Sequence, residues 1–290
     1  MKLGALEAGG TKMVCAVGDE SGHIEEQVSI PTTTPEDTLP KIIDYFRDKG
    51  IEALGVASFG PIDPDPSSPT YGYITTTPKP GWRDYNLLGA LKEVYDIPMG
   101  FDTDVNGSLL GEVTYGASKG ITDAVYITIG TGVGGGIMSG GKLVHGMLHP
   151  ELGHMLLVKH PEDTYKGHCP FHSNCLEGLA SGPAIGERWG KPAAELAGDP
   201  KVWDMEAYYI AQALMTLILT LSPKRIILGG GVMHQEMLFP LIRKKVLEAM
   251  NGYLDTALLK DIDNYIVPAS LHDDQGIMGC LKLALDAAGK

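Results

Sequence analysis

The sequence predicts an α/β protein made of two halves of similar design. Two short apolar runs, 3–8 and 124–129, each break into a glycine turn and continue as a second strand-like run rather than a helix. Glycine lets a backbone turn sharply, and the amides of such a turn can point at the oxygens of a phosphate group. In the rest of both halves, short apolar runs typical of strands alternate with segments whose apolar residues have helical spacing. We therefore expect two phosphate-facing strand–turn–strand units, with the boundary between the halves near residues 115–122.

Composition excludes several classes of protein. A hydrophobic content of 43% with 20% charged residues is ordinary for globular chains and excludes a disordered one. The net charge of −13 argues against a nucleic-acid surface, which needs a basic face. The longest apolar stretch, 213–221, is too short for a bilayer span, and a strand-like run begins within two residues of Met1, where a signal peptide would lie. The 4 cysteines do not resemble a secreted disulfide framework. We expect a cytoplasmic protein that binds neither a membrane nor a nucleic acid.

The first half is expected to begin with a strand meander and to continue with alternating helices and strands. Strands are predicted over 3–8, 13–17 and about 23–30, followed by a helix over 35–49, a strand over 53–58, a helix over 87–95, a strand over 98–101 and a helix from 104 to about 115. The strand over 53–58 runs into a Pro- and Ser-rich loop that extends to Thr70.

The second half repeats the strand–turn–strand beginning. A strand starts at Ala124, and after the glycine-rich turn we predict a strand over 136–139, a second glycine turn and a further strand. Apolar residues fall on one stripe of a predicted helix over 203–221. A buried strand over 225–228 then ends in three glycines, and helices follow.

The turn at 130–135 also fits G-x-G-x-x-G, the fingerprint of dinucleotide-binding proteins, and Glu151 lies about twenty residues beyond it. A dinucleotide fold requires that this turn open a helix, whereas residues 137–143 read as a hairpin. Taken alone, the turn is equally compatible with a tight hairpin that binds nothing. Its pairing with the glycines at 9–10 and 229–231 favours phosphate binding.

Four candidate metal ligands gather within residues 154–175. Cys169, His172 and Cys175 form a Cys-x2-His-x2-Cys loop, and His154 precedes it. Two thiolates and two imidazoles give zinc a closed tetrahedral shell, which is typical of a structural site rather than a catalytic one. The alternative is a chance gathering of two reduced thiols and two surface histidines. The remaining two cysteines lie in apolar runs and are expected to be inert.

Two aspartates follow the strand at 98–101. Asp102 and Asp104 lie just before the next helix, where open α/β sheets place catalytic side chains. An enzyme that phosphorylates a hydroxyl group needs a carboxylate that accepts the hydroxyl proton. Either aspartate could instead cap the helix. Glu151 is a further carboxylate, which could orient sugar hydroxyl groups or stand as an exposed charge.

The motifs together resemble those of the ROK family of repressors, open reading frames and sugar kinases, and within it the zinc-containing bacterial fructokinases. The similarity runs from end to end, and the combination of motifs is specific although no single one is. They are Glu-Ala-Gly-Gly-Thr-Lys (7–12), Ser-Phe-Gly-Pro-Ile-Asp (58–63), Thr-Pro-Lys-Pro-Gly-Trp (77–82), Thr-Asp-Val-Asn (103–106), Ile-Gly-Thr-Gly-Val-Gly (129–134), His-Pro-Glu-Leu-Gly-His (149–154), Cys-Pro-Phe-His-Ser-Asn-Cys (169–175) and Leu-Gly-Gly-Gly-Val (228–232).

The resemblance implies an α/β actin-like ATPase fold, related to ribonuclease H, with duplicated domains and ATP in an interdomain cleft. The N-terminal domain would span residues 1–118 and carry the catalytic aspartate loop. The C-terminal domain would span residues 119–290 and carry the zinc loop and the adenosine site, with a last helix able to pack back on the N-terminal domain.

The resemblance also implies roles for individual residues. Asp104, at the family's Asp-x-Asn position, would be the catalytic base. The ATP contacts would be Gly10, Thr11, Lys12, Thr131, Gly132, Pro183, Gly229, Gly230 and Gly231. The sugar contacts would be Gly60, Pro61, Thr103, Asp104, Glu151, His154 and Glu177. A structural zinc ion would be held by His154, Cys169, His172 and Cys175, and Mg2+ would accompany ATP.

The implied reaction is the ATP-dependent phosphorylation of D-fructose to fructose 6-phosphate, by a chain that could form a homodimer. Glu7 stands where many relatives have Asp, which lengthens a carboxylate near the expected magnesium. Thr103 stands where glucose-specific members have Asn, which favours a sugar other than glucose. Mannose, glucose or an amino sugar remains an alternative substrate, and a non-catalytic sugar-sensing role is the alternative function. A ROK repressor would carry a DNA-binding helix-turn-helix ahead of the first phosphate turn, which here begins at residue 9.

Overall fold

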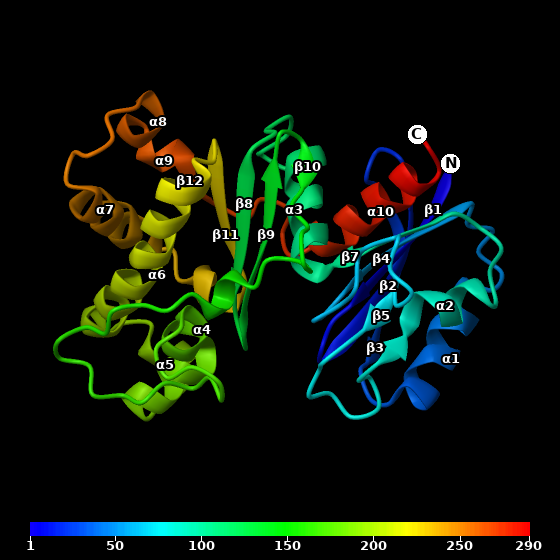
Figure 1. Ribbon diagram of the computed structural model, residues 1–290, viewed down its shortest axis with the longest axis horizontal. Helices are drawn as coiled ribbons and strands as arrows, with labels where there is room; N and C mark the ends of the chain where they lie inside the picture. The colour runs from blue at the N-terminus through cyan, green and yellow to red at the C-terminus, as the bar shows by residue number, and fades with distance from the viewer. The chain divides into compact units, whose positions relative to one another are not determined.

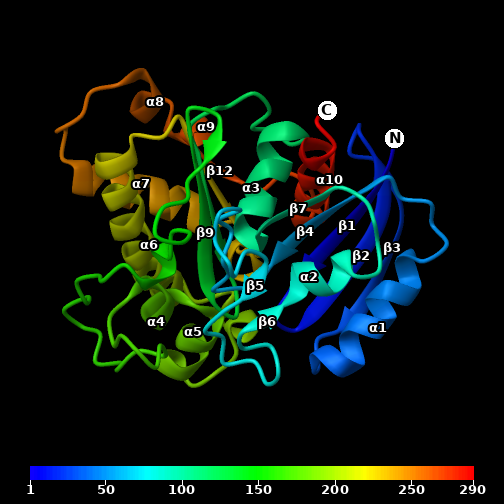
Figure 2. The same cartoon turned by 45° about the vertical axis from the view of Figure 1, so that its right-hand side comes forward.

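The computed structural model describes residues 1–290, which divide into two compact units. The first unit contains residues 1–120, 143–150 and 270–290, and the second contains residues 121–142 and 151–269. Each unit is built on a five-stranded sheet, and Figures 1 and 2 show both sheets with the helices that pack on them. The first unit therefore includes both ends of the chain.

The sheet of the first unit has the strand order β3-β2-β1-β4-β7. Its strands are β1 (Lys2–Ala8), β2 (Lys12–Asp19), β3 (Ile24–Pro31), β4 (Ala53–Ser58) and β7 (Met99–Thr103). β1, β2 and β3 form an antiparallel meander, whereas β4 runs parallel to β1 and β7 parallel to β4. The carboxyl ends of β1, β4 and β7 therefore meet at one edge of the sheet, where ligands bind in open α/β folds.

Helices cover both faces of this sheet. α1 (Pro35–Phe46) and α2 (Leu87–Lys92) share a core with Leu6 and Val56 of the sheet. α3 (Asp104–Thr114) and α10 (Gln275–Ala287) pack on the other face, to which Gly55 points because side chains alternate along β4. A Cβ on Gly55 would lie 1.8 Å from the carbonyl oxygen of Cys280, so the absence of a side chain lets α10 approach the strand closely. The short strands β5 (Tyr73–Ile74) and β6 (Tyr85–Asn86) pair with each other, and Ile74 belongs to the core that α1 and α2 share with the sheet.

The sheet of the second unit has the strand order β10-β9-β8-β11-β12. Its strands are β8 (Ala124–Ile129), β9 (Val133–Ser139), β10 (Lys142–Leu143), β11 (Arg225–Gly229) and β12 (Ile266–Pro268). β8 and β9 are antiparallel, β11 is parallel to β8, and β12 is parallel to β11. Counted along the chain, both sheets have the order third, second, first, fourth, fifth strand, so the topology is duplicated as predicted.

Helices and single turns make up most of the remaining second unit. They are η1 (Leu152–His154), α4 (Leu176–Ala180), α5 (Gly182–Trp189), η2 (Ala193–Leu196), α6 (Pro200–Leu221), η3 (Gly231–His234), α7 (Leu238–Met250), α8 (Ala257–Lys260) and α9 (Ile262–Tyr265). α6 buries the large side chains of Trp203 and Tyr209 completely. None of the helices in the chain combines the length and the apolar character that a membrane span requires.

Candidate active site and metal centre

Asp104 is the first residue of α3, directly after the carboxyl end of β7. The N-cap of this helix is Thr103, whose hydroxyl accepts a hydrogen bond from the amide of Asn106 (3.1 Å), so neither aspartate serves as the cap. The Asp104 carboxylate accepts a hydrogen bond from the amide of Val105 (2.9 Å) and keeps part of its surface open. Burial raises the pKa of Asp104 to about 6. Such a carboxyl group is mostly ionised at neutral pH and still basic enough to accept a proton.

Asp102 bonds to two other side chains, those of Asn106 and His145. Its buried carboxylate accepts a hydrogen bond from Nδ2 of Asn106 (2.7 Å) and pairs with Nε2 of His145 (2.9 Å). The hydrogen bond to Asp102 raises the pKa of His145, because the carboxylate stabilises the imidazolium. Asp102 is thus engaged in structural contacts, which leaves Asp104 as the candidate base.

Glu7 lies in β1, at the same edge of the sheet as Asp104. Burial and the neighbouring charge of Asp104 raise the pKa of Glu7 to about 7, whereas Lys12 opposes this shift. A Cβ on Gly276, in the first turn of α10, would lie 2.1 Å from Glu7 Oε1. Two neighbouring carboxylates with raised pKa values fit a site that takes a cation, because a divalent metal ion bound through oxygen ligands would favour their ionised forms.

The glycine turn between β1 and β2 is held by the end of β3. The hydroxyl of Thr32 donates a hydrogen bond to the carbonyl oxygen of Gly9 (2.7 Å), and the amide of Thr32 donates to the carbonyl oxygen of Thr11 (3.0 Å). Thr11 and Lys12 are exposed, and Gly10 is partly exposed. With its carbonyl groups occupied, the turn can present amides and a hydroxyl group to an anion.

The loop after β4 carries the predicted sugar contacts Gly60 and Pro61. The carbonyl oxygen of Pro61 accepts hydrogen bonds from the amide (2.7 Å) and the hydroxyl (3.0 Å) of Thr75. The amide of Ile62 donates to Nε2 of His149 (3.1 Å), and burial lowers the pKa of this histidine. Because Nε2 accepts a hydrogen bond, His149 is neutral here, and the loop is fixed by three contacts to its backbone.

In the second unit, the predicted ATP contacts come together around the turn between β8 and β9. The amide of Gly182, next to Pro183, donates a hydrogen bond to the carbonyl oxygen of Gly130 (2.7 Å). Gly230 has a φ of 87°, and a Cβ there would lie 2.6 Å from the amide nitrogen of Ile129. Only glycine fits at this point, where the segments 229–231 and 129–132 meet. Thr131 is exposed at the tip of the turn.

Glu177 lies in α4, beside the same turn. Its Oε2 accepts a hydrogen bond from the amide of Val133 (3.1 Å), and a Cβ on Gly132 would lie 2.9 Å from that oxygen. Glu151 is exposed and immediately precedes η1. The predicted sugar contacts are therefore divided between the units: Gly60, Pro61, Thr103 and Asp104 belong to the first, and Glu151, His154 and Glu177 to the second.

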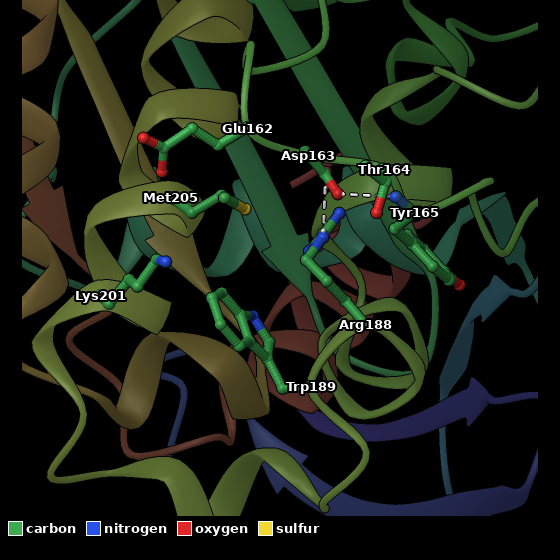
Figure 3. Close-up of a pocket in the computed structure, with 8 residues that line it drawn as sticks. All are labelled: Glu162, Asp163, Thr164, Tyr165, Arg188, Trp189, Lys201 and Met205. Carbon is green, nitrogen blue, oxygen red and sulfur yellow. Dashed lines mark hydrogen bonds and ion pairs between the residues drawn. The ribbon is translucent and has the colours of Figure 1, made fainter.

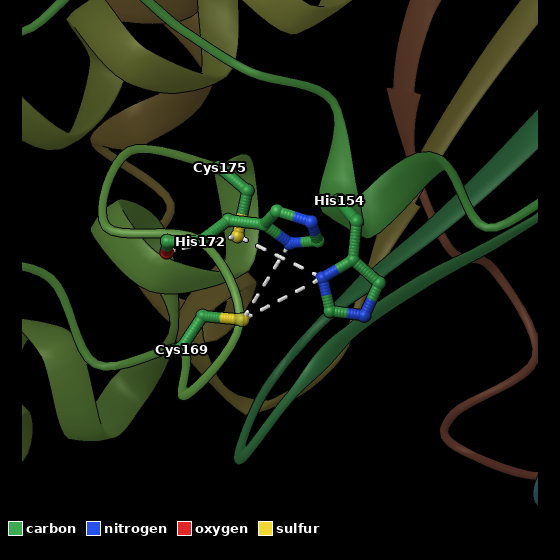
Figure 4. Close-up of side chains that lie close together, drawn as sticks. All are labelled: His154, Cys169, His172 and Cys175. Carbon is green, nitrogen blue, oxygen red and sulfur yellow. Dashed lines mark hydrogen bonds between the residues drawn. The ribbon is translucent and has the colours of Figure 1, made fainter. Parts of the chain in front are cut away.

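The four predicted zinc ligands form one cluster in the second unit, as Figure 4 shows. Nδ1 of His154 lies 3.7 Å from Sγ of both Cys169 and Cys175, and Nδ1 of His172 lies 3.9 Å from Sγ of Cys169. All four ligand atoms lie within 4.8 Å of one another. In a tetrahedral zinc site the sulfur and nitrogen ligands are about 3.6 Å apart, as bond lengths of about 2.3 and 2.05 Å require. The donor set and its spacing are therefore compatible with a zinc ion.

The chain matches the model of the ROK family over residues 3–287. It belongs to the ROK family. A fructokinase from Pediococcus pentosaceus is 49% identical, covering 98% of each chain. A fructokinase from Lactococcus lactis subsp. cremoris is 45% identical, covering 97% of this chain and 96% of that protein. Among solved structures, a ROK glucokinase from Streptomyces griseus in complex with glucose and AMPPNP has a TM-score of 0.79 at 26% identity, covering 99% of this chain and 100% of the other.

This ROK chain has a further cavity of about 250 Å³ in the second unit, which none of the predicted site residues lines. Figure 3 shows the residues that line it: Glu162, Asp163, Thr164, Tyr165, Arg188, Trp189, Lys201 and Met205. Nε of Arg188 pairs with the Asp163 carboxylate (3.0 Å), and its NH2 group donates to the carbonyl oxygen of Leu179 (2.7 Å). The guanidinium also lies over the ring of Tyr165, 4.9 Å from the centroid. Arg188, the only buried cation that lines the cavity, is thus already paired within the protein.

Two residues that shape the ROK site were missed by sequence reasoning. His145, the partner of Asp102, and His149, the partner of Ile62, both come from segment 143–150, which joins the first unit. In the sequence this segment follows a hairpin of the second half, and no residue close to it in the chain indicates what the two histidines bind. A signal was present in the two histidines just ahead of Glu151, but their targets lie 43 and 87 residues away.

Proposed function

We propose that this ROK protein is an ATP-dependent fructokinase, which transfers the γ-phosphoryl group of MgATP to the 6-hydroxyl group of D-fructose. The identity of 49% to a fructokinase over 98% of both chains carries this proposal. The site supports it, because a carboxylate suited to accept a hydroxyl proton follows β7, at the edge of the sheet where the glycine turn also lies. Thr103 agrees with fructose, since it has no amide to offer a glucose hydroxyl, and its own hydroxyl, which accepts one hydrogen bond as a helix cap, can still donate one to the sugar.

Catalysis would consist of positioning and charge stabilisation, as is usual for phosphoryl transfer. Asp104 would accept the proton of the 6-hydroxyl group as its oxygen attacks the γ-phosphorus. The amides and hydroxyls at Gly10, Thr11, Thr131 and Gly132 would bind phosphate oxygens. Mg2+ bound with ATP would neutralise part of the phosphate charge, and Glu7 would hold the ion directly or through water.

The remaining predicted contacts complete the proposal. Lys12 would add a positive charge at the first turn, and Pro183 with Gly229, Gly230 and Gly231 would surround the adenosine. Gly60, Pro61, Thr103, Glu151, His154 and Glu177 would contact the sugar.

We further propose that His154, Cys169, His172 and Cys175 hold a structural zinc ion. The segment around the ligands is paired, since the amide of Leu176 donates to Met155 (2.9 Å) and the amide of Leu157 donates to Asn174 (2.8 Å). His154 is the last residue of η1, which Glu151 immediately precedes, and Cys175 caps α4, which carries Glu177. Zinc would therefore brace two segments of the sugar wall and take no part in the chemistry. Reduced thiols and ATP as substrate suit a cytoplasmic enzyme, and the chain could form a homodimer.

The deciding experiment measures ADP release in a coupled assay with fructose, mannose, glucose and amino sugars. Fructose should give the highest kcat/KM. A higher value with another hexose would overturn the substrate and keep the kinase. Sugar binding without ADP release from any hexose would instead support the non-catalytic sugar-sensing role.

A further inference from the structure

A lysine lies beside the first glycine turn and has no role in the site described above. Lys79 belongs to the loop between β5 and β6, and a Cβ built on Gly10 would lie 3.4 Å from its Cε. The end of the Lys79 side chain therefore lies next to the backbone of Gly10, at the glycine turn. The Lys79 side chain is partly buried, and its ammonium group forms no hydrogen bond or ion pair within the protein.

The loop that carries Lys79 is firmly held. The carbonyl oxygen of Lys79 accepts a hydrogen bond from the amide of Trp82 (3.2 Å), and its amide donates to the hydroxyl of Thr77 (3.3 Å). Trp82 is completely buried, and its Nε1 donates to the carbonyl oxygen of Thr33 (2.6 Å). Thr32, the preceding residue, holds the glycine turn through two hydrogen bonds. The consecutive residues Thr32 and Thr33 thus hold the glycine turn and the loop of Lys79 in a fixed position relative to each other.

The same loop is connected to the predicted sugar contacts. The amide of Thr77 donates to the carbonyl oxygen of Thr75 (3.0 Å), and Thr75 holds the carbonyl oxygen of Pro61 through its own amide and hydroxyl. Lys79 therefore follows, by a few residues, the segment that fixes the sugar loop, and its side chain ends at the phosphate turn. Lys79 thus connects the sugar loop with the phosphate turn, which suits contact with the phosphate that is transferred to the sugar.

Charge supports an anionic ligand at this position. The chain carries a net charge of −13, and the nearby edge of the sheet holds Glu7 and Asp104, yet Lys79 is paired with neither. An unpaired ammonium group beside outward-facing amides attracts phosphate, for which lysine acts as a point charge. The alternative is that Lys79 is an ordinary surface lysine. That alternative gives no reason for its partly buried side chain or for the buried Trp82 that anchors its loop.

We propose that Lys79 binds the phosphoryl group that is transferred, first as the γ-phosphate of ATP and then as the 6-phosphate of the product. This inference rests on the proposed kinase function and deepens it. Lys79 keeps its proton throughout, and its charge stabilises the negative charge on the phosphoryl oxygens in the transition state. Its contact to ADP is weak, because ADP lacks the group that Lys79 binds.

Calorimetry on the full chain tests this with two probes, MgAMPPNP and MgADP. Replacing Lys79 with Met keeps the aliphatic stem and removes the charge. A charge-assisted hydrogen bond contributes enough that Lys79→Met should weaken MgAMPPNP binding by about 10- to 100-fold while changing MgADP binding by less than about twofold. The variant should also lower kcat, and Lys79→Arg should recover part of both losses. Lys41→Met, an exposed lysine on α1, is the matched control and should leave both affinities and kcat unchanged.

The outcomes separate this inference from the proposed function. Unchanged MgAMPPNP binding and kcat in Lys79→Met, in a chain that phosphorylates sugars, would overturn the role of Lys79 alone. Equal weakening of MgADP and MgAMPPNP would also overturn it, because Lys79 would then act through the turn and not on the γ-phosphate. A wild-type chain that binds neither nucleotide would overturn both the kinase and the role of Lys79.

Discussion

Acidification should switch the enzyme off through Asp104. Burial raises the pKa of this carboxyl group to about 6, with the Val105 amide opposing the shift. A general base acts only when it is ionised. With that pKa, about nine tenths of the molecules carry the carboxylate at about pH 7 and about one tenth at about pH 5. The kcat/KM for fructose should therefore fall about tenfold between these two values, with a midpoint near the pKa.

The assay is a steady-state profile of kcat/KM against pH, which reports the groups of the free enzyme. Asp104→Asn should lower kcat by about 10²–10⁴-fold and keep sugar binding, and its residual activity should lose the inflection at about pH 6, because asparagine does not titrate in this range. Glu7 complicates the profile, since its pKa is raised to about 7. Glu7→Gln should therefore retain the lower inflection. An acid limb that survives in Asp104→Asn and disappears in Glu7→Gln would refute the assignment of Asp104.

Two further perturbations test the supporting structure. Cys169→Ser should remove zinc, lower Tm by roughly 5 °C and raise the KM for fructose. Phe171→Ala, at an 83% exposed position of the same loop, is the control and should have none of these effects. Wild-type protein without zinc in elemental analysis and with unchanged activity in chelator would contradict the metal site. The pKa of His145 is raised in the folded state by Asp102, so their pairing stabilises the fold below the ordinary histidine pKa and is lost as pH rises through the folded pKa. His145→Gln should thus lower Tm more at about pH 5.5 than at about pH 8.5, and equal losses would argue against a charged pair.

Local chemistry explains why much of the fold could be predicted. The glycine turns, the strands that flank them and the four candidate metal ligands all depend on short-range sequence patterns. The structure confirms the turns and strands and brings the four candidate ligands together. The ends of some helices differ from the prediction. The predicted helix over 35–49 ends at Phe46, just ahead of Gly50 with its φ of 66°. The helix predicted from Trp203 begins at Pro200, because proline suits a first turn and the Asp199 side chain accepts a hydrogen bond from the amide of Lys201.

Long-range contacts explain what could not be predicted. Nothing near His145 in the sequence indicates that its partner is Asp102, and nothing near Lys79 indicates that its side chain ends beside Gly10. Each contact depends on where an irregular loop is anchored, by Trp82 in one case and within segment 143–150 in the other. Apolar periodicity carries no information about such loops.

The C-terminal position of α10 has a consequence for how the chain is made. β1 and β4 leave the ribosome early, but α10, which packs on Gly55 and Gly107, is translated after every strand of their sheet. Until α10 has left the ribosome, the part of the sheet that it covers stays exposed, and exposed apolar surface of this kind promotes aggregation. A premature stop or a proteolytic cut before Ser270 would therefore remove α10 from the N-terminal half, although the lost residues follow the whole second unit in the sequence.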